Sequence, residues 1–361
     1  MPRFDTGVVA EITESSPAIE KLVVKVGRSK RKAVAFPSVS GKVAVGDKVI
    51  LNTTATELKL GTGGRDFVLW NLANEKHKQM SKGHIMKMRY TPWQFDTMSV
   101  EAPESPHHEK MKEATSLGGM PVVACGLHSQ VPAAAAMLKS VDADLKVAYV
   151  MTDGAALPIA DSELVASLKE KKLIDGTVTT GHAFGGDLEA VNLFSGLLAA
   201  GDVLNADAAI VSIGPGIVGT QTLLGHTGMQ QGQVLSAAAS LGGRPVGVLR
   251  ISFADSRPEH TGVSFHSITA LKYATANRCT IAVPDLPIDR LHLVMGTLAE
   301  SGISEMHDLV IVDAWETAAV LEKAELQPTT MGRTMAEDPD FFEAAGAAGL
   351  LAGRLIYELD D

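Results

Sequence analysis

The chain is poor in cysteine and has no long apolar run. Only 2 of its 361 residues are cysteine, Cys125 and Cys279, and both fall within short apolar stretches, so we expect core residues rather than a disulfide framework. No apolar run reaches the roughly 18 residues that a membrane-spanning helix needs. The first 25 residues alternate polar and apolar side chains, unlike a signal peptide. We therefore expect a cytoplasmic globular protein without a membrane partner.

Three common catalytic or metal-binding motifs are also missing. The sequence has no GxSxG segment, which exposes a nucleophilic serine, and no GxxxxGK[ST] loop, which cradles phosphates. It has no CxxC pair, a frequent zinc-binding unit. These absences argue against an α/β-hydrolase, a P-loop nucleotide hydrolase and a zinc ribbon.

Charge is distributed unevenly along the chain. Residues 1–100 hold 16 Lys and Arg against 9 Asp and Glu, whereas residues 101–361 hold 16 against 33. This asymmetry supports a domain boundary near residue 100. It also makes nucleic acid an unfavourable partner for the larger part, because phosphate backbones require a cationic surface.

Residues 1–95 are predicted to form a small antiparallel β-barrel. Five short segments mix β-branched or aromatic residues with polar ones, and turn-forming residues separate them. Residues 96–119 show little hydrophobic periodicity and are predicted to be a linker with one short helix. The five strands are expected at residues 7–13, 21–26, 32–36, 48–53 and 66–72.

Residues 120–361 are predicted to form a Rossmann-like α/β domain with a doubly wound, mainly parallel sheet of about seven strands. Continuous apolar runs alternate here with helix-like stretches, as in a parallel sheet buried on both faces. The last helix, residues 339–357, is rich in alanine and glycine, so we expect it to pack on the sheet or on another subunit of a homo-oligomer. The other helices are expected at residues 130–141, 162–173, 187–200, 229–241, 264–276, 287–302 and 315–325.

The apolar runs end at residues that can bind a ligand or take part in catalysis. Parallel sheets of this kind bind ligands outside the carboxyl ends of their strands. Several of these residues should therefore meet at one edge of the sheet if their strands are neighbours. They include His128, Asp153, His182, the Gly214-Pro215-Gly216 turn and Asp255.

The densest polar cluster is ADSRPEHTGVSFHSIT, residues 254–269, which follows a predicted strand ending at the start of the cluster. Asp255 and His260 suit either a general acid–base pair or ligands of a divalent metal, and His266 is a further candidate. Arg257 has the planar fork that holds a carboxylate or phosphate. The structural alternative is a polar loop whose aspartate and serines cap turns.

Two glycine-rich segments are weaker candidates for anion binding. In GHAFGGDLE, residues 181–189, His182 and Asp187 could contact a ligand, although acidic residues also favour the start of a helix. The segment GPGIVGT offers Gly214, Gly216, Gly219 and Thr220. It is a poor dinucleotide fingerprint, because its proline removes an amide and no acidic residue follows at about twenty positions.

Long stretches of the chain resemble one bacterial family, catalogued as domain of unknown function 3866. That family pattern often has a second histidine at the position of Phe265, and its absence here weakens a metal role for His266. The resemblance implies no activity or cofactor, so the site residues rest on their own chemistry. The stretches include LNTTATELKLGTGG (51–64), GGMPVVACGLHSQVPA (118–133), GHAFGGDLEAVN (181–192), LGGRPVGVLRISFADSR (241–257) and HTGVSFHSITAL (260–271).

The sequence favours an enzyme, a hydrolase or transferase, that acts on a small anionic metabolite at the carboxyl edge of the sheet. A module that senses a ligand without catalysis is one alternative, and RNA binding through the basic turn at residues 28–32 is another. A third alternative is a structural subunit that assembles through residues 339–357.

Overall fold

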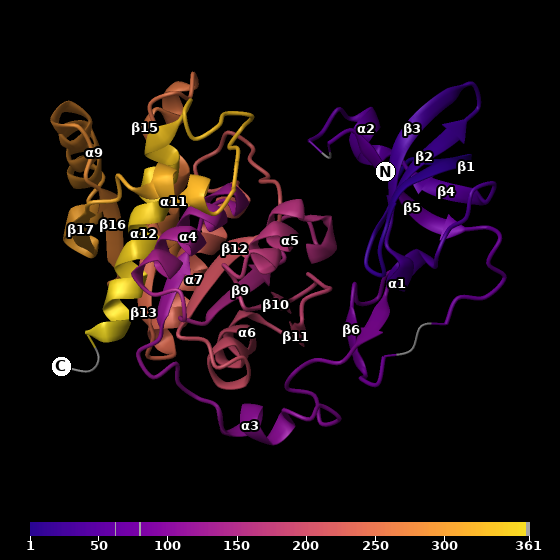
Figure 1. Cartoon of the computed structure of the whole chain (residues 1–361), viewed down its shortest axis with the longest axis horizontal. Helices are drawn as coiled ribbons and strands as arrows, with labels where there is room; N and C mark the ends of the chain where they lie inside the picture. The colour runs from indigo at the N-terminus through magenta and orange to yellow at the C-terminus, as the bar shows by residue number, and fades with distance from the viewer. Residues whose placement is uncertain (62, 79–80, 359–361) are drawn as a thin grey trace. The chain divides into compact units, whose positions relative to one another are not determined.

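The computed structural model describes residues 1–61, 63–78 and 81–358, and it forms two compact units, Met1–Thr97 and Met98–Asp361 (Figure 1). Each unit is described by itself below. No helix in these described ranges is long and apolar enough to cross a membrane.

The first unit contains a closed barrel of five strands in the order β1-β2-β3-β5-β4. All five predicted strands are present, but the β3–β5 pair is parallel, so the barrel is antiparallel in its other four pairs. This is the five-stranded Greek-key architecture found in OB-type domains. The strands are β1 (Phe4–Ser15), β2 (Glu20–Val26), β3 (Ser29–Ala35), β4 (Lys48–Asn52) and β5 (Arg65–Asn71). Shorter elements are α1 (Pro37–Ser40), α2 (Thr54–Glu57), β6 (Ile85–Lys87) and β7 (Phe95–Thr97).

The second unit contains an eight-stranded parallel sheet in the order β11-β10-β9-β12-β8-β13-β16-β17, which confirms the predicted Rossmann-like α/β fold. Every residue of the four strands β8, β9, β10 and β12 is buried, which explains their continuous apolar runs. The strands are β8 (Pro121–Ala124), β9 (Val147–Thr152), β10 (Gly176–Thr180), β11 (Leu188–Ala190), β12 (Ala208–Ile213), β13 (Arg244–Val248), β16 (Thr280–Pro284) and β17 (Asp308–Val312).

Helices cover both faces of this sheet (Figure 1). One hydrophobic cluster joins the sheet to α4, α5, α11 and α12, and a second joins its other face to α6, α7 and α9. The helices are α3 (His108–Glu113), α4 (Val131–Val141), α5 (Glu163–Glu170), α6 (Leu193–Leu198), α7 (Gln230–Ser240), α8 (Phe265–Thr269), α9 (Ile288–Glu300), α10 (Ile303–Met306), α11 (Thr317–Lys323) and α12 (Pro339–Tyr357).

The small-residue helix α12 packs inside its own unit, against α4 and the strands β8, β13 and β16. A side chain at Gly349 would lie 2.0 Å from the carbonyl oxygen of Ala134, so the two backbones approach as closely as glycine permits. The alanines and glycines of α12 therefore serve contacts within the chain.

The prediction of one helix over residues 187–200 is wrong at its start. The chain there forms the edge strand β11, which makes the sheet eight strands wide rather than seven. The Asp187 carboxylate accepts hydrogen bonds from the backbone amide and hydroxyl of Thr177, which ties the chain to β10. The helix α6 begins only after Asn192, whose side chain caps it by accepting from the amide of Ser195.

The apolar run that was expected to end at Asp255 leaves the sheet earlier. Strand β13 ends at Val248, and Ile251–Ser252 (β14) pairs with Gly262–Val263 (β15) in a separate antiparallel ribbon. Side-chain amides of Gln231 and Gln130 donate to the carbonyls of Val248 and Leu249, in place of a neighbouring strand. Asp255 therefore lies on the loop that joins β14 to β15.

Candidate functional site

A cavity of about 760 Å³ opens beyond the carboxyl ends of β8, β12 and β13. The loops that follow these three strands supply most of its wall, together with the start of α8 and the segment before α12. One part of the wall is apolar and another carries arginine, glutamate and histidine. The lining residues are Leu127, Ile217, Gly219, Gln221, Leu223, Arg250, Arg257, Glu259, His260, Phe265, His266 and Met331.

Asp255 lies beside this cavity at the centre of an arginine cluster. Arg257 binds its carboxylate through two nitrogens, with Nε 2.9 Å from Oδ1 and Nη2 2.7 Å from Oδ2. Nη2 of Arg250 lies 3.2 Å from Oδ2, and Nη2 of Arg333 lies 3.5 Å from the same oxygen. The hydrogen bonds from Arg257 above all hold the pKa of Asp255 well below its usual range, so the carboxylate stays charged.

A second buried carboxylate, Asp338, anchors this cluster to the start of α12. Arg333 Nε lies 2.9 Å from Asp338 Oδ2, and the Ser252 hydroxyl donates to the same oxygen at 2.8 Å. The Ser252 oxygen in turn accepts from the backbone amide of Asp255. The β14–β15 loop is therefore held by contacts with the segment that precedes α12.

Arg250 is the buried cation of the site. The residue is 5% exposed, and Asp255 is the one partner of its guanidinium within the described chain. Burial first, and then repulsion from Arg257, lowers the pKa of Arg250 to about 10, which still leaves it charged at neutral pH. A guanidinium has five N–H donors, so Arg250 keeps donors that no described residue satisfies. Its side chain lines the cavity, where a ligand could accept from these donors.

Three histidines and a phenylalanine form a ring cluster next to Arg250. The His226 and His266 rings stack at a centroid distance of 4.0 Å, and the His260 ring meets His266 edge-on at 4.9 Å. Phe265 packs 5.4 Å from His260. Burial above all, together with the neighbouring positive charges, lowers the pKa of His260 to about 4 and that of His266 to about 3. All three imidazoles are therefore neutral near pH 7.

Hydrogen bonds orient two of these rings. Nδ1 of His260 lies 2.7 Å from the Ser264 hydroxyl, and Nε2 of His226 lies 2.8 Å from the Thr269 hydroxyl. Ser264 is fully buried and caps α8 through the amide of His266, so it positions His260 and does not reach a ligand. Nε2 of His260 has no partner in the described chain, so it is the ring nitrogen that remains to contact a ligand in the cavity.

The expected metal ligands do not converge. Within the described ranges, no group of three or more His, Cys, Asp or Glu side chains is arranged to hold a metal ion. The imidazoles stack on one another, and the Asp255 oxygens are hydrogen-bonded to arginines. The residues present therefore fit an anion better than a cation.

Asp153, His182 and His128 lie at strand ends but do not line this cavity. Oδ2 of Asp153 accepts from the backbone amide of His182 at 2.9 Å, which joins the ends of β9 and β10. His128 is buried and uses both ring nitrogens, with the Tyr149 hydroxyl at 3.0 Å and the Ser162 hydroxyl at 2.7 Å. Burial lowers the pKa of His128 to about 4, so it is a neutral core residue at pH 7.

Of the remaining predicted anion-binding residues, Gly219 borders the cavity. Asp187 lies at the amino end of β10, away from the carboxyl edge. A side chain at Gly214 would meet the carbonyl oxygen of Ala156 at 2.1 Å, so this glycine permits a close approach of two loops. Gly216 has a φ of +95° in the loop after β12, and the Thr220 hydroxyl donates to the carbonyl of Gly225.

Sequence reasoning overlooked Arg250, Arg333 and Asp338. Arg250 had a usable signal, because it is a lone charge within the apolar run PVGVLRISFA. Arg333 and Asp338 come from the irregular segment before α12, and nothing in the sequence marks them in this way. Their roles depend on the fold, which returns that segment to the β14–β15 loop.

Comparison with known families adds one finding. The model of the family described as Protein of unknown function (DUF3866) matches residues 32–349. The chain belongs to this family. The DUF3866 match runs from within β3 to within α12 and includes every residue that lines the cavity, and it confirms the resemblance seen in the sequence. A search of curated proteins finds no match to the chain.

Proposed function

We propose that this protein is an enzyme that acts on a small anionic metabolite in the cavity at the carboxyl edge of the sheet, by hydrolysis or group transfer. The observation that carries the proposal is the buried Arg250 guanidinium, which lines the cavity and has a single carboxylate partner in the described chain. A buried cation with unused donors is stabilised by an anionic ligand that completes its hydrogen bonds.

The metabolite has an anionic head and an apolar part. Arg250 and Arg257 offer N–H donors to a carboxylate or phosphate, whose oxygens suit the planar guanidinium fork. Another part of the wall is apolar, which favours a ligand that also carries apolar carbon surface. The apolar lining residues are Leu127, Ile217, Leu223, Phe265 and Met331.

His260 is the proposed acid–base group. Its pKa of about 4 is too low for a proton carrier near pH 7 while the cavity is empty. A bound anion adds a negative charge beside the ring and raises that pKa towards neutrality. The anion therefore brings His260 into the range in which an imidazole transfers protons efficiently.

Calorimetric titration with inorganic phosphate and with succinate tests the anion site. We expect one of the two to bind, and Arg250→Lys to weaken it at least about tenfold because a lysine cannot form the bidentate contact. Arg250→Met should abolish binding. Arg278→Met is the matched control, because Arg278 is exposed and pairs with Asp308 at the amino end of the sheet. Equal affinity in all variants would disprove the anion site.

The same titration at pH 6, in two buffers of different ionisation enthalpy, tests the role of His260. We expect the wild type to take up more protons on binding than His260→Gln, because the anion raises the pKa of that imidazole and the ligand's own proton exchange is common to both proteins. Equal proton exchange in the two proteins would contradict the acid–base role and favour a ligand sensor without catalysis.

A further inference from the structure

The first unit carries its aromatic residues outside its core. The hydrophobic cluster inside the barrel consists of aliphatic residues, from Val9 to Val68. Large aromatic side chains normally contribute much of the apolar area that a core buries. Here they lie at the surface or are partly buried, and Phe36 stacks on Phe67. They are Phe4, Phe36, Phe67, Trp70, Tyr90, Trp93 and Phe95.

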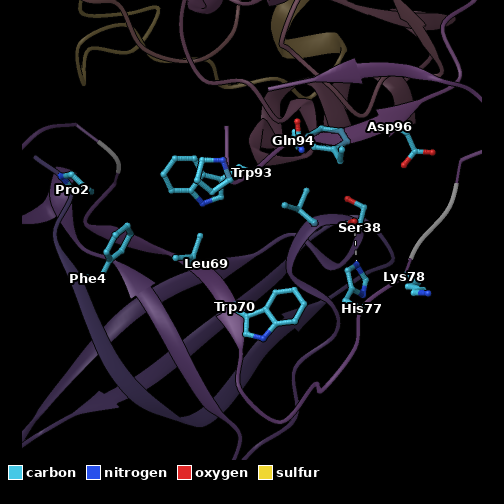
Figure 2. A pocket seen from close by; sticks show the side chains of 13 residues that line it. Pro2, Phe4, Ser38, Leu69, Trp70, His77, Lys78, Trp93, Gln94 and Asp96 are labelled. Atoms are coloured by element: carbon cyan, nitrogen blue, oxygen red, sulfur yellow. Dashed lines mark hydrogen bonds between the residues drawn. The ribbon is translucent and has the colours of Figure 1, made fainter. Parts of the chain in front are cut away.

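Four of these aromatic residues line one cavity of about 790 Å³ within the first unit. Phe4 comes from the start of β1, Trp70 from β5, and Trp93 and Phe95 from the segment that enters β7. Figure 2 shows Phe4, Leu69 and Trp70 on the barrel, with Trp93 and Gln94 facing them from the other side of the cavity. The cavity is thus bounded by flat rings on two sides.

Polar groups are interspersed with the rings. The His77 ring packs edge-on against Trp70 at a centroid distance of 6.2 Å, and its Nε2 lies 3.3 Å from the carbonyl oxygen of Ser38 (Figure 2). The Gln94 amide has no partner in the described chain and offers both a donor and an acceptor. Lys78 and Asp96 add one cation and one carboxylate to the lining (Figure 2).

The charge of this unit is complementary to a polyanion. Residues 1–97 hold 16 Lys and Arg against 9 Asp and Glu, whereas the rest of the chain is strongly acidic. The excess is densest in the segment that includes the lining residues His77 and Lys78, because residues 76–89 contain five Lys and Arg and no Asp or Glu.

We propose that this cavity binds single-stranded nucleic acid, with unpaired bases stacked on Trp70 and Trp93. Every base presents a flat π-face, and stacking on aromatic side chains beside a cationic track is how small barrels hold single strands. A duplex cannot insert its bases, because they are already stacked and paired. A peptide would use the rings but has no need of the net positive charge of this unit.

This site differs from the basic turn at residues 28–32 that the sequence suggested for RNA. No residue of that turn lines the cavity, and Arg31 is paired with Asp5 and Asp66. It is also independent of the proposed anion cavity, which lies wholly in the second unit.

Fluorescence anisotropy of labelled oligouridylate and oligothymidylate, each of about 12 nucleotides, tests the proposal on the full chain. We expect binding that weakens steeply between about 50 and 200 mM salt, because phosphate contacts release counterions. Trp70→Leu and Trp93→Leu should each weaken binding about tenfold, which corresponds to about 1.4 kcal/mol. Stronger binding of uridylate identifies RNA as the source of the ligand, and stronger binding of thymidylate identifies DNA.

Trp315→Leu is the matched control, because Trp315 is 63% exposed and belongs to the second unit. We expect it to bind as the wild type does. Trp70→Phe and Trp93→Phe keep a stacking ring and should restore most of the affinity, which separates stacking from a folding defect. No binding at about 100 µM oligonucleotide overturns the proposal, since even non-specific complexes form in that range. Salt-independent binding of a proline-rich peptide in place of the oligonucleotide also overturns it.

Discussion

The two units of this protein build their cores from different side chains, and their surfaces differ accordingly. The barrel core is aliphatic, and four aromatic residues of the first unit line a surface cavity. The α/β unit buries Tyr149, Phe341 and Phe342, and a cavity lined by arginine and histidine opens at the carboxyl edge of its sheet. The side chains that a core does not use determine what chemistry each surface can offer.

Net charge is a poor guide to the site within the acidic unit. Residues 101–361 have about twice as many acidic as basic residues, yet three arginines meet beside one cavity. Residues 1–97 hold 16 Lys and Arg against 9 Asp and Glu, and their described part has no such cluster of buried cations. We therefore expect local arrangement to decide which ion binds in the α/β unit, and overall charge to decide it for the barrel.

The largest expected effect is a loss of stability when the close packing of α12 is disturbed. This packing distinguishes α12 from the exposed helices of the same unit. Gly349→Ala should destabilise the α/β unit by about 3 kcal/mol, because its methyl group would overlap the backbone of Ala134. Gly296→Ala on α9 is the control, since open space surrounds that position. There the substitution should stabilise by about 0.5–1 kcal/mol through helix propensity.

Denaturant unfolding followed by tryptophan fluorescence measures both variants. Trp70 and Trp93 belong to the barrel and Trp315 to the α/β unit, so a Trp70→Phe, Trp93→Phe background reports on the second unit alone. Equal effects of the two alanine substitutions would contradict the close contact between α12 and α4.

We expect a fall in pH to have an intermediate effect on the stability of the α/β unit. The folded-state pKa values of His260 and His266, about 4 and about 3, lie below the ordinary histidine value of 6.5. Between about pH 6.5 and 4 the unfolded chain therefore binds protons that the folded chain does not, and stability falls as the pH falls. Asp255, whose pKa is lowered, adds a further loss below about pH 4.

The barrel is the internal control for this pH effect, because neither of its histidines, His77 and His84, is buried. Lowering the pH from 7 to 5 should shift the thermal unfolding transition of the α/β unit to lower temperature and leave that of the barrel nearly unchanged. A Trp315→Phe variant reports on the barrel alone. A parallel shift of both transitions would argue against the buried histidines as the cause.

The sequence predicted those parts of the site that lie close together along the chain. Asp255, Arg257, His260 and His266 fall within sixteen residues, so their proximity needed no knowledge of topology. Arg333 reaches Asp255 only because the segment before α12 returns to the β14–β15 loop, and no local pattern records that return. Strand β11 was missed for a similar reason, since three residues are too few to show a period, and hydrogen bonds from Thr177 to Asp187 hold the chain there.

The smallest expected effect tests Asp187, which the sequence placed among the anion-binding residues. Its carboxylate pairs with Lys169 at 2.6 Å, and both side chains are about half exposed, so Asp187→Asn should cost about 1 kcal/mol or less of stability. Phosphate or succinate affinity should not change, because Asp187 binds Thr177 at the amino end of β10 and the cavity opens at the carboxyl edge. Urea unfolding and calorimetric titration measure the two quantities. A tenfold loss of anion affinity would restore the sequence-based hypothesis and show that the ligand extends beyond the arginine cavity.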